Sequence, residues 1–514
     1  MAAGFVIRKN QYYDSVFLMG VNKRLSQTKG VLQTAVLMAS EKNKQLLTNI
    51  GIHGDQINEA QPNDLIVAVI AESTQVVDTV LAGLDQALLA LEEKGSVSHL
   101  HNLEDGLVEK PHANLAVLTI PGEYVFREAR KALEAGLNLF IFSSNVPIGE
   151  ERKLKELAAE KKLLVMGPDC GTSIINGIGV GFANKVNRGV FGAIGPSGTG
   201  LQEFTSQIHN AGYGISHAIG TGSRDLSDEI GGITTIQALD ALEADPQTKV
   251  VSIIAKPPGG KTLERLLTRL KICSKPIVSC FLGARMDSFE GGDALTWVPT
   301  IDDAVLAAIQ HIGEKPTAAR IELTKQEREL AVKSRADWAN EQRFIRGLFA
   351  GGTFCYQSQQ ILGEAGIAVH SNAPLNPQTK LAHPDRSYQH TLIDMGDETY
   401  TLGKPHPMID GTMRRLRILC ESRDPSVAVL LLDFILGYNA SMDPVGELYD
   451  AILEAKQAMR QQGGELTIVA SICGTKEDPQ ELDLQVKLLS EAGVIVFRSN
   501  AKATLFCCEL LNPV

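Results

Sequence analysis

The sequence predicts an α/β protein built mainly from parallel, doubly wound sheets. Strand-type and helix-type segments alternate along the chain, which is typical of βαβ units joined by right-handed crossovers. A strand, a glycine-rich turn and a helix also follow one another twice, in residues 190–215 and again in residues 345–369. The second copy begins about 160 residues after the first, a spacing that indicates domain duplication rather than a solenoid.

The 514 residues leave room for roughly three domains. Residues 1–183 are predicted to form one doubly wound domain, because strand and helix signals alternate throughout them. The duplicated units follow as residues 186–312 and residues 343–514, and each passes through a helix and an Asp-Pro pair into a buried strand. Residues 313–342 carry dense charge and are predicted to be a helical linker with a solvated face.

Charge and composition exclude several classes of partner. The net charge of −11 argues against nucleic acid or an anionic membrane as the main partner. No segment resembles a signal peptide or a membrane span, so a soluble, cytoplasmic protein is expected. The eight cysteines are scattered without CxxC or zinc-type spacing, which predicts reduced core thiols and no metal site.

The two glycine-rich turns are candidate phosphate-binding sites, and we call residues 197–200 the first cradle and residues 351–353 the second cradle. A strand-to-helix turn of this kind directs unpaired backbone N–H groups and the positive end of a helix dipole at one point. The alternative is a tight turn without a ligand, since the spacing matches neither a P-loop nor GxGxxG. The predicted phosphate-binding residues are Ser197, Gly198, Thr199, Gly200, Gly351, Gly352 and Thr353.

Three further side chains are candidates for substrate chemistry. His406 lies between two prolines in a rigid stretch, and a near-neutral imidazole there suits proton transfer to a leaving nitrogen or phosphate binding. The alternative for His406 is a loop cap bonded to a backbone carbonyl. Arg224 is a candidate for binding a substrate carboxylate, although pairing with Asp225 or Asp228 is an equal alternative. Lys404 would add charge at the phosphate, with an ordinary exposed lysine as the alternative.

Several motifs carry a resemblance to known families. Residues 112–144, with the turn MGPDCG at 166–171, resemble the CoA-binding domain of succinyl-CoA synthetase α subunits, and the second unit resembles the carboxyl-terminal domain of the β subunits. Five motifs in order resemble the FdrA/YahF family along nearly the full length. They are YDSVFLM (13–19), MGPDCGTS (166–173), SGTG (197–200), RDLSDEIGG (224–232) and GKPHPMID (403–410). This resemblance implies a Rossmann-like N-terminal domain followed by two flavodoxin-like domains of the succinyl-CoA synthetase type.

Two departures from the synthetase pattern limit the chemistry that the resemblance implies. Residues 5–13 contain no glycine where the α subunits have a glycine-rich turn for the CoA nucleotide, so CoA binding is doubtful. Residues 288–294 contain no histidine where the synthetases carry their phosphorylated histidine. Phosphate therefore remains as a co-substrate, and no cofactor is certain.

Members of the FdrA-like family are associated with allantoin and purine catabolism. The resemblance implies a subunit of oxamate carbamoyltransferase, which converts oxalurate and phosphate into oxamate and carbamoyl phosphate. It also implies a small anionic ureido or carbamoyl substrate, other subunits as partners, and an oligomer. Two alternatives stay open: an acyl-CoA synthetase-like ligase subunit acting with a separate ATP-grasp protein, and a non-catalytic scaffold subunit.

Overall fold

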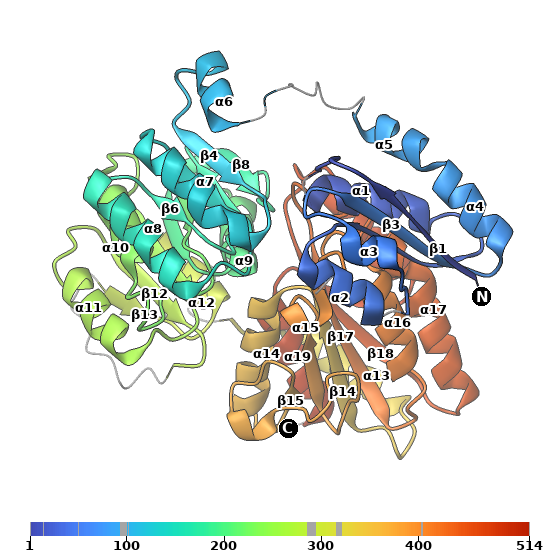
Figure 1. Cartoon of the computed structure of the whole chain (residues 1–514). Coiled ribbons are helices and arrows are strands. Elements are labelled where there is room, and N and C mark those ends of the chain that lie inside the picture. Colours follow the sequence, from blue (N-terminus) through green and yellow to red (C-terminus); the bar gives the residue numbers. More distant parts are fainter. Residues whose placement is uncertain are drawn as a thin grey trace. The chain divides into compact units, whose positions relative to one another are not determined.

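The computed structural model describes residues 2–13, 15–49, 51–92, 100, 102–284, 295–314, 321–401 and 404–512. Contacts divide the chain into two compact units, which are described separately (Figure 1). The first unit comprises Met1–Ala113, Thr119–Tyr124 and Thr401–Pro405, and the second comprises the rest of the chain. Among the helices of these described residues, none has both the length and the apolar character needed to cross a membrane.

The first unit contains an antiparallel sheet. Its strands are β1 (Ala2–Arg8), β2 (Val31–Met38) and β3 (Leu65–Ala71), in the spatial order β1-β3-β2. Both outer strands run antiparallel to β3, so β1 and β2 share a direction and β3 lies between them. The helices of this region are α1 (Ser15–Ser26), α2 (Glu41–Asn49), α3 (Asp55–Glu59), α4 (Thr74–Ala82), α5 (Leu84–Glu92) and α6 (Leu103–Glu109).

This arrangement corrects the prediction of a single, mostly parallel sheet over residues 1–183. Strand and helix do alternate as predicted, but alternation does not fix strand direction, and a later strand can insert between the two strands of a βαβ unit. β3 takes the central position because its sequence LIVAVIA is apolar throughout and nearly every residue in it is buried. The first half of the predicted N-terminal domain is therefore a different fold from the second half.

The parallel sheet predicted for this region is present in residues 115–166. β4 (Leu115–Leu118), β5 (Asn138–Ile141) and β6 (Val165–Met166) pair in parallel in that order. α7 (Gly122–Glu134) connects β4 to β5, and α8 (Ile148–Lys161) connects β5 to β6. The βαβ alternation predicted for residues 1–183 is therefore present in residues 115–166.

The strands of the first duplicated unit join β7 and β8, from residues assigned to the predicted N-terminal domain, in a seven-stranded sheet with the order β13-β12-β11-β9-β10-β7-β8. The five strands from β9 to β13 are parallel, and β7 and β8 add an antiparallel edge. The strands are β7 (Thr172–Ile175), β8 (Ile178–Gly181), β9 (Arg188–Gly195), β10 (Ile215–Gly220), β11 (Val250–Ala255), β12 (Ile277–Phe281) and β13 (Leu295–Trp297). The helices are α9 (Gly198–Asn210), α10 (Ile233–Ala244), α11 (Gly260–Leu270) and α12 (Ile301–His311).

The second duplicated unit is built on a six-stranded parallel sheet with the order β15-β16-β14-β17-β18-β19. The strands are β14 (Phe344–Phe349), β15 (His370–Ser371), β16 (Thr391–Asp394), β17 (Val427–Ile435), β18 (Thr467–Cys473) and β19 (Ile495–Phe497). The helices are α14 (Gly352–Glu364), the 3-10 turn η2 (Pro377–Thr379), α15 (Glu398–Thr401), α16 (Thr412–Glu421), α17 (Gly446–Gln461), α18 (Leu482–Glu491) and α19 (Asn500–Leu511). Every residue of β17 is buried, as expected of a strand covered on both faces.

The α/β class and the parallel sheets of both duplicated units are confirmed. In each copy the repeated strand, β9 or β14, lies next to the buried strand that follows the repeat in sequence, β11 or β17. The predicted linker contains α13 (Lys325–Ala336), which begins with a capping box between Thr324 and Glu327. α13 also contacts the last helix, because Arg328 pairs with Glu509 at 2.8 Å and Ala331 is buried.

Polar contacts join the two large sheets of the second unit. The Asn184 amide donates to the Leu436 carbonyl at 2.9 Å and to Asp478 at 2.7 Å. The backbone N–H of Lys185 donates to the other oxygen of Asp478 at 2.8 Å, and Gln202 of α9 donates to Leu436 at 3.1 Å. Asn184, Gln202 and Asp478 are buried, so water does not compete for these bonds.

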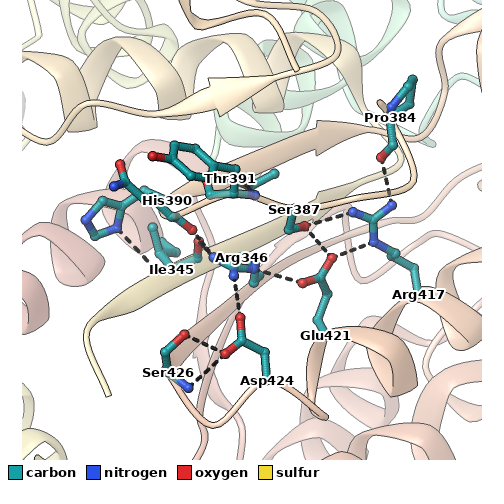
Figure 2. A network of polar contacts seen from close by, with 12 residues as sticks. Ile345, Arg346, Pro384, Ser387, His390, Thr391, Arg417, Glu421, Asp424 and Ser426 are labelled. Atoms are coloured by element: carbon teal, nitrogen blue, oxygen red, sulfur yellow. Dashed lines mark hydrogen bonds and ion pairs between the residues drawn. The ribbon is translucent and has the colours of Figure 1, made fainter. Parts of the chain in front are cut away.

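A buried ionic network holds the loop that leads into β16 (Figure 2). Glu421 of α16 accepts hydrogen bonds from Arg346 of β14 at 2.8 Å and from Arg417 at 2.5 Å. Arg417 also donates to the Ser387 hydroxyl at 2.8 Å and to the Pro384 carbonyl at 3.0 Å. Because both guanidinium groups and the carboxylate are buried, the network fixes this loop against α16 and β14.

Candidate functional site: two cradles and a buried carboxylate

The two cradles lie in contact. α9 and α14 begin directly after the N-cap residues Ser197 and Gly351, and at neither helix start does an N-cap side chain accept a backbone N–H. The Ser197 hydroxyl instead hydrogen bonds to the Thr353 hydroxyl of the other cradle. A Cβ on Gly200 would lie 3.3 Å from the Thr353 side-chain methyl. Two positive helix ends are therefore brought to one place.

Asp433 of β17 shapes the second cradle. Its two carboxylate oxygens accept the backbone N–H groups of Ala350 and Gly351 at 2.8 and 2.7 Å. The Arg414 guanidinium pairs with the same carboxylate at 2.9 Å, and both side chains are buried. The N–H groups of Ala350 and Gly351 thus donate to the side chain of Asp433 and not to a ligand. These bonds fix the orientation of the turn.

The remaining N–H groups at the start of both helices are available to bind a ligand. Within the described residues, the N–H groups of Gly198, Thr199, Gly352 and Thr353 have no hydrogen-bond acceptor. The first turn of a helix leaves such donors without an intrahelical partner, and they favour an anion. The contact between the cradles therefore brings together four donors suited to phosphate or to a developing oxyanion.

His406 lies beside the second cradle but differs from its predicted state. Its Nδ1 accepts the backbone N–H of Met408 at 3.2 Å, and a Cβ on Gly396 would lie 2.9 Å from its Nε2. Burial, together with the nearby Arg414 charge, lowers the pKa of the imidazole to about 4. The expectation of a near-neutral pKa is thus wrong, because it ignored burial. A neutral ring whose Nδ1 accepts a hydrogen bond carries its proton on Nε2, so His406 is a hydrogen-bond donor.

Asp394 and Lys256 are two residues at this site that the sequence did not single out. Asp394 ends β16, is only 9% exposed, and accepts the Gly396 N–H at 3.0 Å. Lys256 follows β11, and its Nζ lies 4.6 Å from the centre of the Tyr356 ring in α14. Their position in the sequence could have indicated a role. Each lies at the carboxyl end of a buried parallel strand, where α/β sheets bind ligands.

Among the described residues, no contact joins Arg224 to the cradles, and Lys404 belongs to the first unit. The Arg224 guanidinium pairs with the buried Glu151 at 2.8 Å and donates to the Val146 carbonyl at 2.6 Å. Its partner is therefore neither Asp225 nor Asp228, the two alternatives that the sequence offered. Lys404 is exposed. The assignment of these two residues to substrate binding stays a prediction.

Removing the Arg224 charge is expected to affect stability rather than substrate affinity. Arg224→Met should lower the free energy of unfolding by about 1–3 kcal/mol, because Glu151 is fully buried and, among the described residues, would keep Lys155 as its one counter-ion. Urea unfolding measures this change, and Arg265→Met, which removes an exposed guanidinium, serves as the control. A raised KM with unchanged stability would instead restore Arg224 to the substrate site.

The structure bears on one of the two departures from the synthetase pattern. The glycine-free stretch at residues 5–13 belongs to the antiparallel first unit, so it is not the counterpart of a nucleotide-binding strand in a parallel sheet. That ground for doubting CoA binding is therefore removed. The histidine-free stretch at residues 288–294 lies outside the described residues.

Comparisons with known proteins identify the parts of the chain. Residues 1–102 match the family model described as AllF, heavy metal-associated domain, residues 188–262 match a CoA binding domain, and residues 348–507 match a CoA-ligase domain. A relative from Escherichia coli K12, described as uncharacterized protein YahF, is 39% identical over 99% of both chains. The α subunit of the ADP-forming succinate–CoA ligase of Methanothermobacter thermautotrophicus is 26% identical over 36% of this chain and 62% of its own.

A solved structure of ATP citrate lyase from Methanothrix soehngenii, in complex with citrate and coenzyme A, also overlaps this chain. It covers 80% of this chain and 83% of its own at 13% identity, with a TM-score of 0.34. An overlay this loose supports no inference about the site.

The heavy-metal label of the first family model does not fit the residues present. Soft metal ions select thiolate ligands, and residues 1–102 contain no cysteine. In the part of the chain that the structure describes, no group of three or more histidine, cysteine, aspartate or glutamate side chains is arranged to hold a metal. The first unit therefore shares the fold named by the model without its ligands.

Proposed function

Because the chain belongs to the FdrA/YahF family, we propose that it is a subunit of a phosphate-dependent carbamoyltransferase that converts oxalurate and phosphate into oxamate and carbamoyl phosphate. The observation that carries this proposal is the contact between the two cradles, with four unpaired N–H groups at two helix N-termini. A tetrahedral anion is the ligand that such donors favour. The AllF-related first unit supports a place in allantoin breakdown.

The reaction needs two sets of donors, and the site supplies two. Phosphate must be held near the ureido carbonyl carbon, and negative charge develops on the carbonyl oxygen as phosphate adds. One cradle would hold phosphate while the other receives the developing oxyanion. The Nε2–H of His406 would add a neutral donor beside the second cradle, in the manner of an uncharged imidazole that polarises a carbonyl.

The test is carbamoyl transfer from carbamoyl phosphate to oxamate, without ATP or CoA, by the chain alone and then with the proteins encoded beside it. Gly352→Asp should lower the rate by at least about tenfold, because a Cβ at this position would lie 2.5 Å from a carboxylate oxygen of Asp394 and the new charge repels an anion. Gly363→Asp is the matched control, since it lies in the same helix with no atom within 4 Å of its Cβ.

A CoA-ligase subunit is the second candidate, favoured by the CoA-ligase and CoA-binding domain matches. An ADP-forming ligase would need an ATP-grasp partner. If the assembly fails to transfer carbamoyl groups but forms an acyl-CoA with ATP, the ligase assignment replaces the carbamoyltransferase. If a partner is fully active in both reactions without this chain, the chain is a scaffold.

Replacing His406 separates donation of a hydrogen bond from transfer of a proton. We expect His406→Gln to keep more transfer activity than His406→Ala, because the glutamine amide nitrogen can take the place of the Nε2–H donor. The pH–rate profile of His406→Gln should follow that of the wild type, since a group with a pKa of about 4 is already neutral above pH 5. Equal loss in both variants, together with a lost pH limb, would make His406 the proton-transfer group.

A further inference from the structure

The carboxyl ends of strands from two sheets converge on the cradles, and each adds a polar group. The first cradle follows β9 and the second follows β14, while Lys256 follows β11 and Asp394 ends β16. Ligands of parallel α/β sheets bind beyond these ends. Lys256 and Asp394 are the two charged groups of this set without a role in the proposed reaction.

Asp394 is a buried carboxylate in which one oxygen accepts a hydrogen bond and the other does not. Its Oδ1 accepts the Gly396 N–H at 3.0 Å. Its Oδ2 points at the first residue of α14, where a Cβ on Gly352 would lie 2.5 Å away. Among the described residues, no donor bonds to Oδ2. A carboxylate that is 9% exposed and incompletely bonded is unusual unless a ligand completes it.

The groups around Asp394 place its proton equilibrium close to neutrality. Burial is the main cause that raises the pKa of Asp394 to about 6; the Lys256 ammonium opposes this shift, and the charges of Asp397 and Asp433 add to it. Asp433 is itself held by the Arg414 guanidinium, and the nearby imidazole of His406 is neutral.

Two side chains of α14 complete these surroundings. Burial raises the pKa values of Cys355 and Tyr356, so both stay protonated. Asp394 therefore faces one cation, two other carboxyl side chains and several neutral groups.

Building on the phosphate-dependent carbamoyl transfer proposed above, we propose that Asp394 carries the proton from hydrogen phosphate to the leaving nitrogen, and that Lys256 binds the carboxylate of the ureido acid. An oxygen of hydrogen phosphate forms a bond to the ureido carbonyl carbon. The bond from that carbon to the oxamate nitrogen breaks, and its electron pair stays on nitrogen. The Asp394 carboxylate takes the phosphate proton and gives it to that nitrogen, so no proton is left over.

Two substitutions with matched controls test this assignment in the full assembly. Asp394→Asn should lower kcat for carbamoyl transfer to oxamate by about 100-fold or more, leave KM unchanged, and abolish the loss of rate as pH falls through about 6. Asp394→Glu should restore part of the rate. Lys256→Met should raise KM for oxamate by about tenfold. Glu398→Gln and Lys261→Met, both at exposed positions, should resemble the wild type.

A second readout needs no turnover. The folded state binds a proton at Asp394 more tightly than the unfolded state does, so stability falls as pH rises from about 4 to about 6. Asp394→Asn should therefore melt at a higher temperature than the wild type at pH 8, with the two converging at pH 4. A melting temperature lowered at pH 8 would assign Asp394 a structural role instead.

The possible failures are distinguishable. A wild-type assembly without transfer activity overturns the proposed function. An active wild type whose Asp394→Asn variant keeps both its rate and its pH limb overturns the proton-transfer role and leaves the function standing. Calorimetric titration with oxamate tests Lys256 separately, since binding should weaken in Lys256→Met and not in Lys261→Met. Equal binding in both variants overturns the carboxylate assignment.

Discussion

Replacing Asp433 by alanine is expected to lower the free energy of unfolding by about 3–5 kcal/mol. The substitution leaves the N–H groups of Ala350 and Gly351 without an acceptor. It also leaves the buried guanidinium of Arg414 without its carboxylate partner. Each buried group left unpaired costs about 1–3 kcal/mol, and a charge costs more than a neutral donor.

Urea unfolding followed by tryptophan fluorescence measures this loss. The two tryptophans, Trp297 and Trp338, both belong to the second unit, so their signal reports the unit that contains Asp433. Asp450→Ala removes an exposed carboxylate from α17 and should change stability by less than about 0.5 kcal/mol. A similarly small effect for Asp433→Ala would mean that water replaces the carboxylate.

The second large effect is expected for Glu421→Ala, which should also cost about 3–5 kcal/mol. Glu421 is the shared counter-ion of Arg346 and Arg417 in the buried network (Figure 2). Removing it leaves two buried guanidinium groups with no carboxylate between them, although Arg346 keeps its contact with Asp424 at 2.8 Å.

The network supplies its own control. Asp424 is 41% exposed, so Asp424→Asn should cost less than about 1 kcal/mol in the same fluorescence experiment. The decisive result is that Glu421→Ala loses more free energy of unfolding than Asp424→Asn. Equal losses would show that the network acts through its exposed rim and not through its buried centre.

The cradles could be predicted because a strand, a glycine turn and a helix start are local features. Ser197 and Gly351 do precede the helices as predicted, and the family resemblance is confirmed by the 39% identical relative. The direction of β1, β2 and β3 could not be predicted in the same way. Strand direction depends on which strands pair in space, and the alternation of strand and helix signals carries no information on it.

The chemistry of the site depended on contacts between distant residues. His406 has a depressed pKa because of burial and of Arg414, and no local pattern reveals either. Arg224, in the turn between β10 and α10, pairs with Glu151 of α8, which lies far away in the sequence. Asp394 and Lys256 stand in sequence contexts that resemble ordinary strand ends. Their position after buried strands is a general signal, and the contact between the two sheets is what singles out these two strand ends.

The two large sheets of the second unit belong to a single chain. Hydrogen bonds from Asn184 and Lys185 to Leu436 and Asp478 join them. The contact between the two cradles is therefore intramolecular. The effective concentration of one cradle at the other is set by the chain and does not depend on the protein concentration. Dilution cannot separate the two halves of this site. An activity that declines on dilution would consequently report the departure of another subunit, and its concentration dependence would give the affinity of that partner.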